Sequence, residues 1–235
     1  MPNYDSVPST STRSEALNAF MRGVYMWMGA GLGLTAITAY TVASTPTLAQ
    51  AIFSNQLLFW GLIIGELLLV VAISGGISKM SAQTATGLFL LYSGLNGVTL
   101  SAILLLYTAT SIASTFVVCA GMFGAMSIYG MTTKKDLTSW GSFLFMGLVG
   151  VILASVVNIF LRSPALNFAI SGIGVLVFVG LTAYDTQKLK SMGESAPMDD
   201  STAIRRGTIL GALTLYLDFI NLFLMLLRFF GQMRE

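Results

Sequence analysis

Seven long apolar segments, separated by short polar connections, constrain the fold of this 235-residue chain more than any other feature. The segments cover residues 23–43, 57–74, 84–107, 112–131, 141–161, 165–184 and 208–227. A helix rises about 1.5 Å per residue, so roughly 20 apolar residues cross a hydrocarbon core of about 30 Å. Because every segment reaches about this length, the sequence predicts seven transmembrane helices.

The composition excludes a soluble domain. Charged residues make up only 9% of the chain and hydrophobic residues 55%, whereas soluble domains contain about 25% charged residues. The 24 glycines suit close packing of helices in lipid, and a net charge of +2 spread over the connections gives no indication of a nucleic-acid partner. We therefore expect an all-α integral membrane protein, with a polar tail at residues 1–21 and one transmembrane domain at residues 22–235.

The basic residues predict the orientation in the membrane, because cytoplasmic loops of membrane proteins carry an excess of Lys and Arg. Seven spans place the tail and every second connection on one side, together with nine of the twelve basic residues. These nine are Arg13, Arg22, Lys79, Lys134, Lys135, Lys188, Lys190, Arg205 and Arg206, against Arg162, Arg228 and Arg234 on the other side. We expect a cytoplasmic N-terminus, a C-terminus outside, and a flexible cytoplasmic loop at residues 188–207.

Three acidic residues, Glu66, Asp185 and Asp218, fall within or at the ends of the apolar segments. An ionised Asp at the centre of a membrane helix costs roughly 2.5 to 3.5 kcal/mol on insertion scales, so such residues are functional candidates. Asp218 shares one helix face with Gly211, Thr214, Asn221, Met225 and Arg228. This face is expected to point into the bundle or a water-filled path; the alternative is a structural hydrogen bond to a neighbouring helix.

Asp185 and Glu66 each allow a structural interpretation beside the functional one. Asp185 follows the sixth segment and is able to pair with Lys188 or Lys190, but an antiparallel packing of the last two helices would bring it towards Asp218. The uncertain ends of the segments leave a difference in depth of several ångströms to about 15 Å. Glu66 has no polar neighbour one turn away on its own helix, and it fits either an ion path or a protonated structural group.

A pair of aspartates would supply the pH sensitivity that histidine usually provides, because the chain contains no histidine. Two nearby carboxyl groups in a low-dielectric site do not both ionise cheaply, and they titrate as a unit. Their oxygens, with Thr214 and Asn221 nearby, also suit Ca²⁺, although two carboxylates fall short of the six to eight oxygens of a tight site. We expect weak, transient calcium binding at Asp185 and Asp218, and no resident cofactor.

Four segments resemble the Bax inhibitor-1 family, in particular its bacterial inner-membrane branch: "GLTAYDTQKL", "GALTLYLDFINLFLMLLRFFG", "YGMTTKKDLTSWGSFLFMGL" and "LYTATSIASTFVVCAGMFGAMS". The resemblance implies a multi-pass inner-membrane protein whose last helix is surrounded by the other six. It also implies a pH-sensitive leak of calcium, with protons sensed by a pair that corresponds to Asp185 and Asp218. A basic residue of the second-helix region lies near this pair in relatives, and Lys79 is the candidate here.

An intramembrane aspartyl protease is the enzyme alternative, because such enzymes also place a Tyr-Asp motif on one helix and a second Asp on the next. Here Leu215, Tyr216 and Leu217 precede Asp218, where those enzymes require Gly-x-Gly. The segment at residues 164–166, Pro-Ala-Leu, precedes the first Asp instead of following the second. We therefore expect no enzyme activity.

A regulatory membrane protein is the other alternative. The resemblance implies it, because some bacterial relatives are implicated in modulating a membrane-bound quality-control protease, and eukaryotic relatives in restraining cell death. The polar tail would then contact a membrane protease or another membrane protein. Deleting residues 1–18 would abolish such a role and leave ion flux intact.

Overall fold

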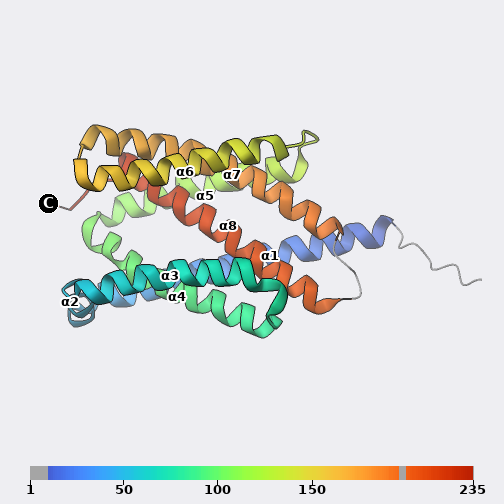
Figure 1. Cartoon of the computed structure of the whole chain (residues 1–235), viewed down its shortest axis with the longest axis horizontal. Helices are drawn as coiled ribbons and strands as arrows, with labels where there is room; N and C mark the ends of the chain where they lie inside the picture. Colours follow the sequence, from blue (N-terminus) through green and yellow to red (C-terminus); the bar gives the residue numbers. More distant parts are fainter. Residues whose placement is uncertain (1–9, 196–199, 235) are drawn as a thin grey trace, which may run out of the picture.

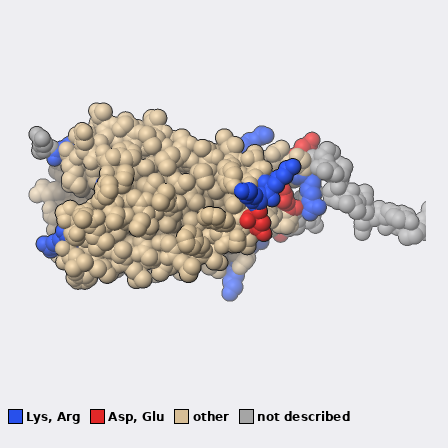
Figure 2. Space-filling view, turned by 90° about the horizontal axis from the view of Figure 1, so that it is seen from above, with Lys and Arg blue, Asp and Glu red and all other residues tan. Residues whose placement is uncertain are grey.

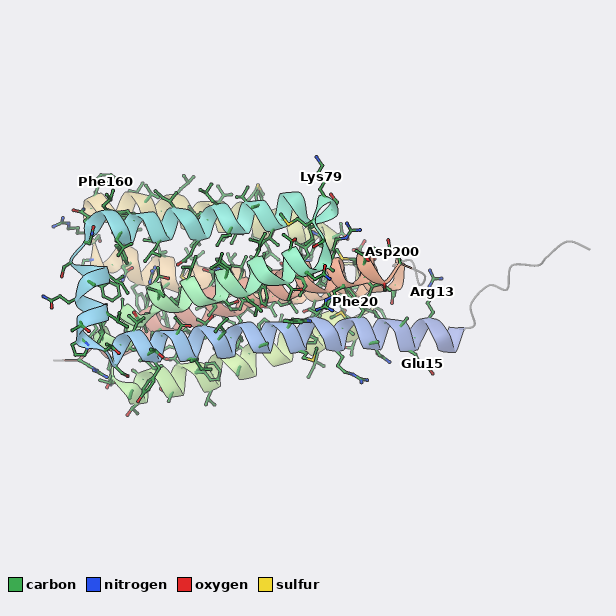
Figure 3. All side chains as sticks on the ribbon, turned by 90° about the horizontal axis from the view of Figure 1, so that it is seen from below. Arg13, Glu15, Phe20, Lys79, Phe160 and Asp200 are labelled. Atoms are coloured by element: carbon green, nitrogen blue, oxygen red, sulfur yellow. The ribbon has the colours of Figure 1, made fainter. Side chains whose placement is uncertain are left out.

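The computed structural model describes residues 10–195 and 200–234. This part of the chain is mostly helical, with short non-helical connections and one isolated β-bridge between Tyr107 and Met233. The helices are α1 (Thr10–Ala43), α2 (Pro46–Phe53), α3 (Gln56–Gly76), η1 (Ile77–Lys79), α4 (Ala82–Leu106), α5 (Ala109–Thr132), α6 (Thr138–Leu161), α7 (Pro164–Ser195) and α8 (Ser201–Phe230). Seven of the helices in the described part are long and apolar enough to cross a membrane. The predicted all-α fold with seven spans is confirmed; the short α2 lies across one end of the bundle (Figure 3).

The last helix is the centre of the bundle. Figure 1 shows α8 running between α6 and α7 on one side and α3 and α4 on the other, and it packs against α1, α4, α5 and α7. Within its most apolar 18-residue window, 67% of α8 is buried, compared with 11–39% for the other six spans. The central position of the last helix, which the resemblance implied, is therefore confirmed.

Side chains at the helix starts satisfy backbone N–H groups that lack a partner within the helix. The hydroxyl of Ser81 accepts a hydrogen bond from the backbone N–H of Thr84 at the start of α4, at 3.1 Å. At the start of α8, the carboxylate of Asp200 accepts one from Ala203 N at 2.8 Å. Arg162 adopts the left-handed conformation (φ 49°) between α6 and α7, so the chain reverses there within a few residues.

The prediction of a loop at residues 188–207 is wrong for the described residues. Helix α7 continues to Ser195 and α8 already begins at Ser201; residues 196–199 lie outside the described part of the chain. The Asp200 cap starts α8 early, and the end of α7 is supported by α1, because Arg13 Nε donates a hydrogen bond to the carbonyl of Glu194 at 3.0 Å. Most of the connection between the sixth and seventh spans thus consists of extensions of α7 and α8.

Helix α1 begins within the segment that was expected to be a polar tail. It starts at Thr10, and the side chains of Phe20 and Met21 are buried. Phe20 packs against Gly193 of α7, where a Cβ atom would lie 2.7 Å from the Phe20 ring. Residues 1–9 of the expected tail lie outside the described part.

Glycine allows α5 and α7 to approach closely. A Cβ atom on Gly130 would overlap the carbonyl oxygen of Ala183, whereas a Cβ on Gly121 of the same helix would meet nothing within 4 Å. We expect Gly130→Ala to lower the free energy of unfolding by about 1–3 kcal/mol, because α5 and α7 are pushed apart. Gly121→Ala should leave stability unchanged or slightly raised, because alanine favours helix.

Thermal unfolding of both variants in the same detergent tests this prediction. Equal melting temperatures for Gly130→Ala and Gly121→Ala would contradict the close packing of α5 on α7.

Candidate functional site

The two candidate aspartates face a common cavity of about 1050 Å³. Helices α3, α4, α6, α7 and α8 border this cavity, and most of its lining is apolar. Its polar groups include Glu66 of α3, Asp185 and Lys188 of α7, and Thr214, Asp218 and Asn221 of α8. The structure therefore brings together most of the residues that the sequence singled out.

The carboxyl groups of Asp185 and Asp218 lie within hydrogen-bonding range of each other. Asp218 is buried, with 5% of its surface exposed, and Asp185 is half-buried. An ionised carboxyl group only accepts hydrogen bonds, so one of the two must be protonated for the groups to bond to each other. The geometry suits a pair that holds one proton in common.

One oxygen of Asp218, Oδ2, is buried and has no hydrogen-bond donor among the described residues, apart from a protonated Asp185. A buried carboxyl oxygen without a donor is costly, and such atoms are usually satisfied by water or an ion. A proton shared with Asp185, or a small polar ligand in the cavity that Asp218 lines, would satisfy this atom.

Small residues hold α7 and α8 close together on both sides of the pair. A Cβ atom on Gly174 of α7 would lie 2.7 Å from the sulfur of Met225, and one on Gly211 of α8 would lie 2.8 Å from a methyl group of Leu189. The two helices thus meet most closely one to three turns from the aspartates. This packing explains why two carboxyl groups 33 positions apart in the sequence become neighbours.

Lys188, and not Lys79, is the basic residue that the structure places at the cavity. Lys188 lies one turn after Asp185, lines the cavity, and has its ammonium 6.0 Å from the centre of the Tyr184 ring. Lys79 is exposed on η1 and points away from the bundle (Figure 3), because α3 ends at Gly76 before the chain turns. The expected contact of Lys79 with the aspartates is therefore not formed. The alternative partner Lys190 instead donates to the carbonyl of Met131 at 2.9 Å.

Thr214 and Asn221 line the cavity on either side of Asp218. The Thr214 hydroxyl donates to the carbonyl of Leu210 at 3.0 Å, and the Asn221 amide donates to that of Leu217 at 2.8 Å. These bonds use donor groups, so the side-chain oxygens keep lone pairs for a cation. The described residues contain no group of three or more Asp, Glu, His or Cys side chains arranged to hold a metal ion. The acidic residues that line the cavity are Asp185, Asp218 and Glu66.

Glu66 is held by hydrogen bonds from a neighbouring helix. Its carboxylate accepts from Asn96 Nδ2 at 3.1 Å and from Thr99 Oγ1 at 2.9 Å, both on α4. Asn96 Oδ1 in turn accepts from the hydroxyl of Tyr216 on α8 at 3.1 Å, and this hydroxyl lies 2.7 Å from Thr35 Oγ1 on α1. A single buried polar network thus links α3, α4, α8 and α1.

The sequence prediction for Glu66 considered only its own helix and missed these partners. A signal was present, because Ser93, Asn96 and Thr99 recur at a spacing of three in the third apolar segment. Such spacing places polar groups on one face of a helix, and a polar face inside a membrane bundle usually contacts another polar group.

The fold and the site together define a polytopic membrane protein with an aspartate pair beside a cavity at its central helix. The sequence model of the family described as "Inhibitor of apoptosis-promoting Bax1" matches residues 17–235. The inner membrane protein YbhL of Escherichia coli K12 is 58% identical over 233 residues, covering 99% of this chain and 98% of YbhL. A protein of Rickettsia prowazekii is 45% identical over 241 residues, covering the whole of both chains. The chain therefore belongs to the Bax inhibitor-1 family.

The similarity to these relatives also indicates the membrane in which the protein resides. An uncharacterized protein of Borreliella burgdorferi is also 50% identical, over 96% of this chain and 98% of its own length. Together, the seven apolar helices and the likeness to an inner membrane protein support a multi-pass location in the inner membrane.

The Tyr216 hydroxyl is expected to stabilise the bundle, because it joins α8 to both α4 and α1. Tyr216→Phe leaves Asn96 and Thr35 without this partner in a buried site, at a cost of about 1–3 kcal/mol in the free energy of unfolding. Tyr92→Phe is the matched control: its ring packs edge-on against Tyr216 with centroids 5.7 Å apart, but its hydroxyl is outside the network. Chemical unfolding in detergent compares the two; equal losses of stability would argue against the network.

Proposed function

We propose that this chain is a channel-like calcium leak of the inner membrane, gated by the Asp185–Asp218 pair. The observation that carries the proposal is the contact of two carboxyl groups at the wall of a 1050 Å³ cavity beside the central helix. Charged groups at such depth are costly, and in membrane proteins they mark ion and proton pathways.

In this proposal one shared proton holds the gate closed. While the proton is present, the two carboxyl groups bridge α7 and α8, and the pair carries a single negative charge. Loss of the proton leaves two negative charges in contact, which repel each other and favour separation of the helices at this level. The doubly charged pair also attracts cations. Calcium flux is therefore expected to rise with pH.

Calcium suits the site as a passing ion. The hard oxygen ligands that Ca²⁺ prefers are available from the aspartates, from Thr214 and Asn221, and from water in the cavity. Their number is too small for tight binding, and conduction requires binding weak enough for the ion to leave. Calcium and protons are thus the proposed small partners of the site, with no resident cofactor.

The proposed orientation places the N-terminus in the cytoplasm, because nine of the twelve basic residues fall on that side. Asp185 lies ten positions before the end of α7, on the half of the helix nearer that side. The pair would then respond chiefly to cytoplasmic pH.

Calcium entry into liposomes containing the purified protein, followed with a trapped dye at about pH 6, 7 and 8, tests the proposal over the range that a shared proton covers. Wild-type flux should rise across this range. Asp185→Asn and Asp218→Asn should each hold flux at the low, acid-like level at every pH, because asparagine is neutral like the protonated acid. Asp136→Asn, at an exposed carboxylate between α5 and α6, is the matched control and should behave as wild type.

Two results would contradict the proposal. One is no flux above empty liposomes with folded protein at any pH. The other is a pH dependence that survives in Asp185→Asn and Asp218→Asn.

Regulation of another membrane protein is a second candidate. The first turns of α1 project beyond the other helices (Figure 3), and the side chains of Arg13, Ser14 and Glu15 are exposed there. A membrane protease or another membrane protein would bind this arm. A truncation lacking residues 1–18 separates the two functions, because it should abolish partner binding while the aspartate pair remains intact.

A further inference from the structure

The cavity opens sideways towards the surrounding lipid, between α3 and α6. These two helices are the least buried spans, with 11% of each buried; α3 packs on α4, and α6 packs on α7. The cavity walls on this side are apolar and exposed, formed by Leu67 of α3 and by Phe145, Ile152, Val156 and Ile159 of α6. We call this opening the lateral groove.

A basic pocket adjoins one end of the lateral groove. This second cavity, of about 500 Å³, is lined by Lys134 and Lys135 from the connection before α6, and it shares Tyr184 and Lys188 with the large cavity. It lies at the end of the bundle where α1 begins, and charged residues gather at that end (Figure 2). We call it the lysine pocket.

The lysine pocket keeps a positive charge although it also contains an acidic residue. Asp136 accepts a hydrogen bond from the backbone N–H of Thr138 at 2.8 Å, and the hydrogen bonds with Thr138 hold the pKa of Asp136 below its usual value. Asp136 is therefore ionised and turned to the start of α6. Asp185 lies one turn from Lys188 and is a second counter-charge. Two carboxyl groups beside the ammonium groups of Lys134, Lys135 and Lys188 still leave the pocket with an excess of positive charge.

We propose that an anionic phospholipid binds here, with its phosphate in the lysine pocket and one acyl chain in the lateral groove. An anionic head joined to a long hydrocarbon chain is complementary to a basic pocket that continues into an apolar groove within the membrane. Basic pockets between membrane helices on the cytoplasmic side are suited to lipid headgroups. The groove follows α6 from Gly141 to Ile159, about 27 Å of helix, which exceeds the roughly 15 Å depth of half a hydrocarbon core. An acyl chain therefore fits along it.

The bound chain would close the lateral opening of the cavity that holds the aspartate pair. Water and ions would then reach the pair only along the bundle and not from the side. This lipid site does not depend on the calcium leak, because binding is measured without any flux.

Native mass spectrometry of the full chain, released from mixed micelles with equal amounts of phosphatidylglycerol and phosphatidylcholine, tests the headgroup. Wild type should retain phosphatidylglycerol in preference. Lys134→Gln, Lys135→Gln and Lys188→Gln should each lower its retention about fivefold, the effect of one basic residue at an anionic surface. Lys79→Gln removes an exposed lysine that lines neither cavity, and it should retain the lipid as wild type does.

A second pair of variants tests the groove. Val156 lines the cavity and Val157 does not, yet the two are similarly exposed, at 49% and 50%. Val156→Trp should fill the groove and reduce retention of phosphatidylglycerol several-fold, whereas Val157→Trp should not. Melting temperatures of both variants confirm that each is folded.

Four outcomes would overturn the proposal. The first is equal retention of the two lipids by wild type, and the second is a loss in Lys79→Gln as large as in the lysine-pocket variants. The third is the same retention in Val156→Trp and Val157→Trp, which would mean that the acyl chain does not use the groove. Displacement of the lipid by millimolar inorganic phosphate would also contradict a site that holds both head and chain.

Discussion

Asp218 lies on the most buried helix of a protein that is surrounded by hydrocarbon, and its carboxyl group has to be satisfied from within the bundle. The arrangement of the site follows from this constraint. Helix α7 supplies the partner, Asp185, and glycines at Gly174 and Gly211 allow the two helices to approach closely enough for the carboxyl groups to meet. Two carboxyl groups bond to each other only when they hold a proton, and this requirement is the basis of the proposed pH sensitivity.

A different set of contacts anchors the opposite face of α8. Tyr216 precedes Asp218 by two residues, which rotates its side chain by about 200° around the helix. Its hydroxyl joins the network of Asn96, Thr35 and Glu66 on three other helices. In the proposed mechanism, α8 remains fixed to α1 and α4 on this face while its contact with α7 changes. The Glu66 network thus fixes one side of α8, and the aspartate pair lies on the other side.

The apolar segments were sufficient to predict the spans, because helix length in a membrane is set by the thickness of the hydrocarbon core. The ends of the last two helices were not predictable in this way. Residues 188–195 and 201–207 are polar, and they are helical because Asp200 caps α8 and Arg13 supports α7 from another helix. Hydropathy does not predict these hydrogen bonds, which lie outside the apolar segments.

The candidate site was also only partly predictable from the sequence. Asp185 and Asp218 were identifiable because a carboxylate stands out in an apolar segment, but their contact depends on the packing of α7 and α8, which a single sequence does not determine. Lys79 and Lys188 were both candidates near the pair. The turn after Gly76 excludes Lys79 from the site, because η1 directs the Lys79 side chain away from the bundle. The hydrogen-bond partners of Glu66 lie on another helix, α4, so the neighbours of Glu66 on its own helix did not reveal them.

Infrared difference spectroscopy of the protonated carboxyl band detects the proton that Asp185 and Asp218 are proposed to share. The reconstituted protein would be titrated from about pH 5 to 9, which spans the range open to a buried acid pair. A shared proton should give one carboxyl band that disappears as pH rises, is absent or displaced in Asp185→Asn and Asp218→Asn, and remains in Glu66→Gln. A band that is unchanged in both aspartate variants, or the lack of any titrating carboxyl band in wild type, would contradict a proton held between Asp185 and Asp218.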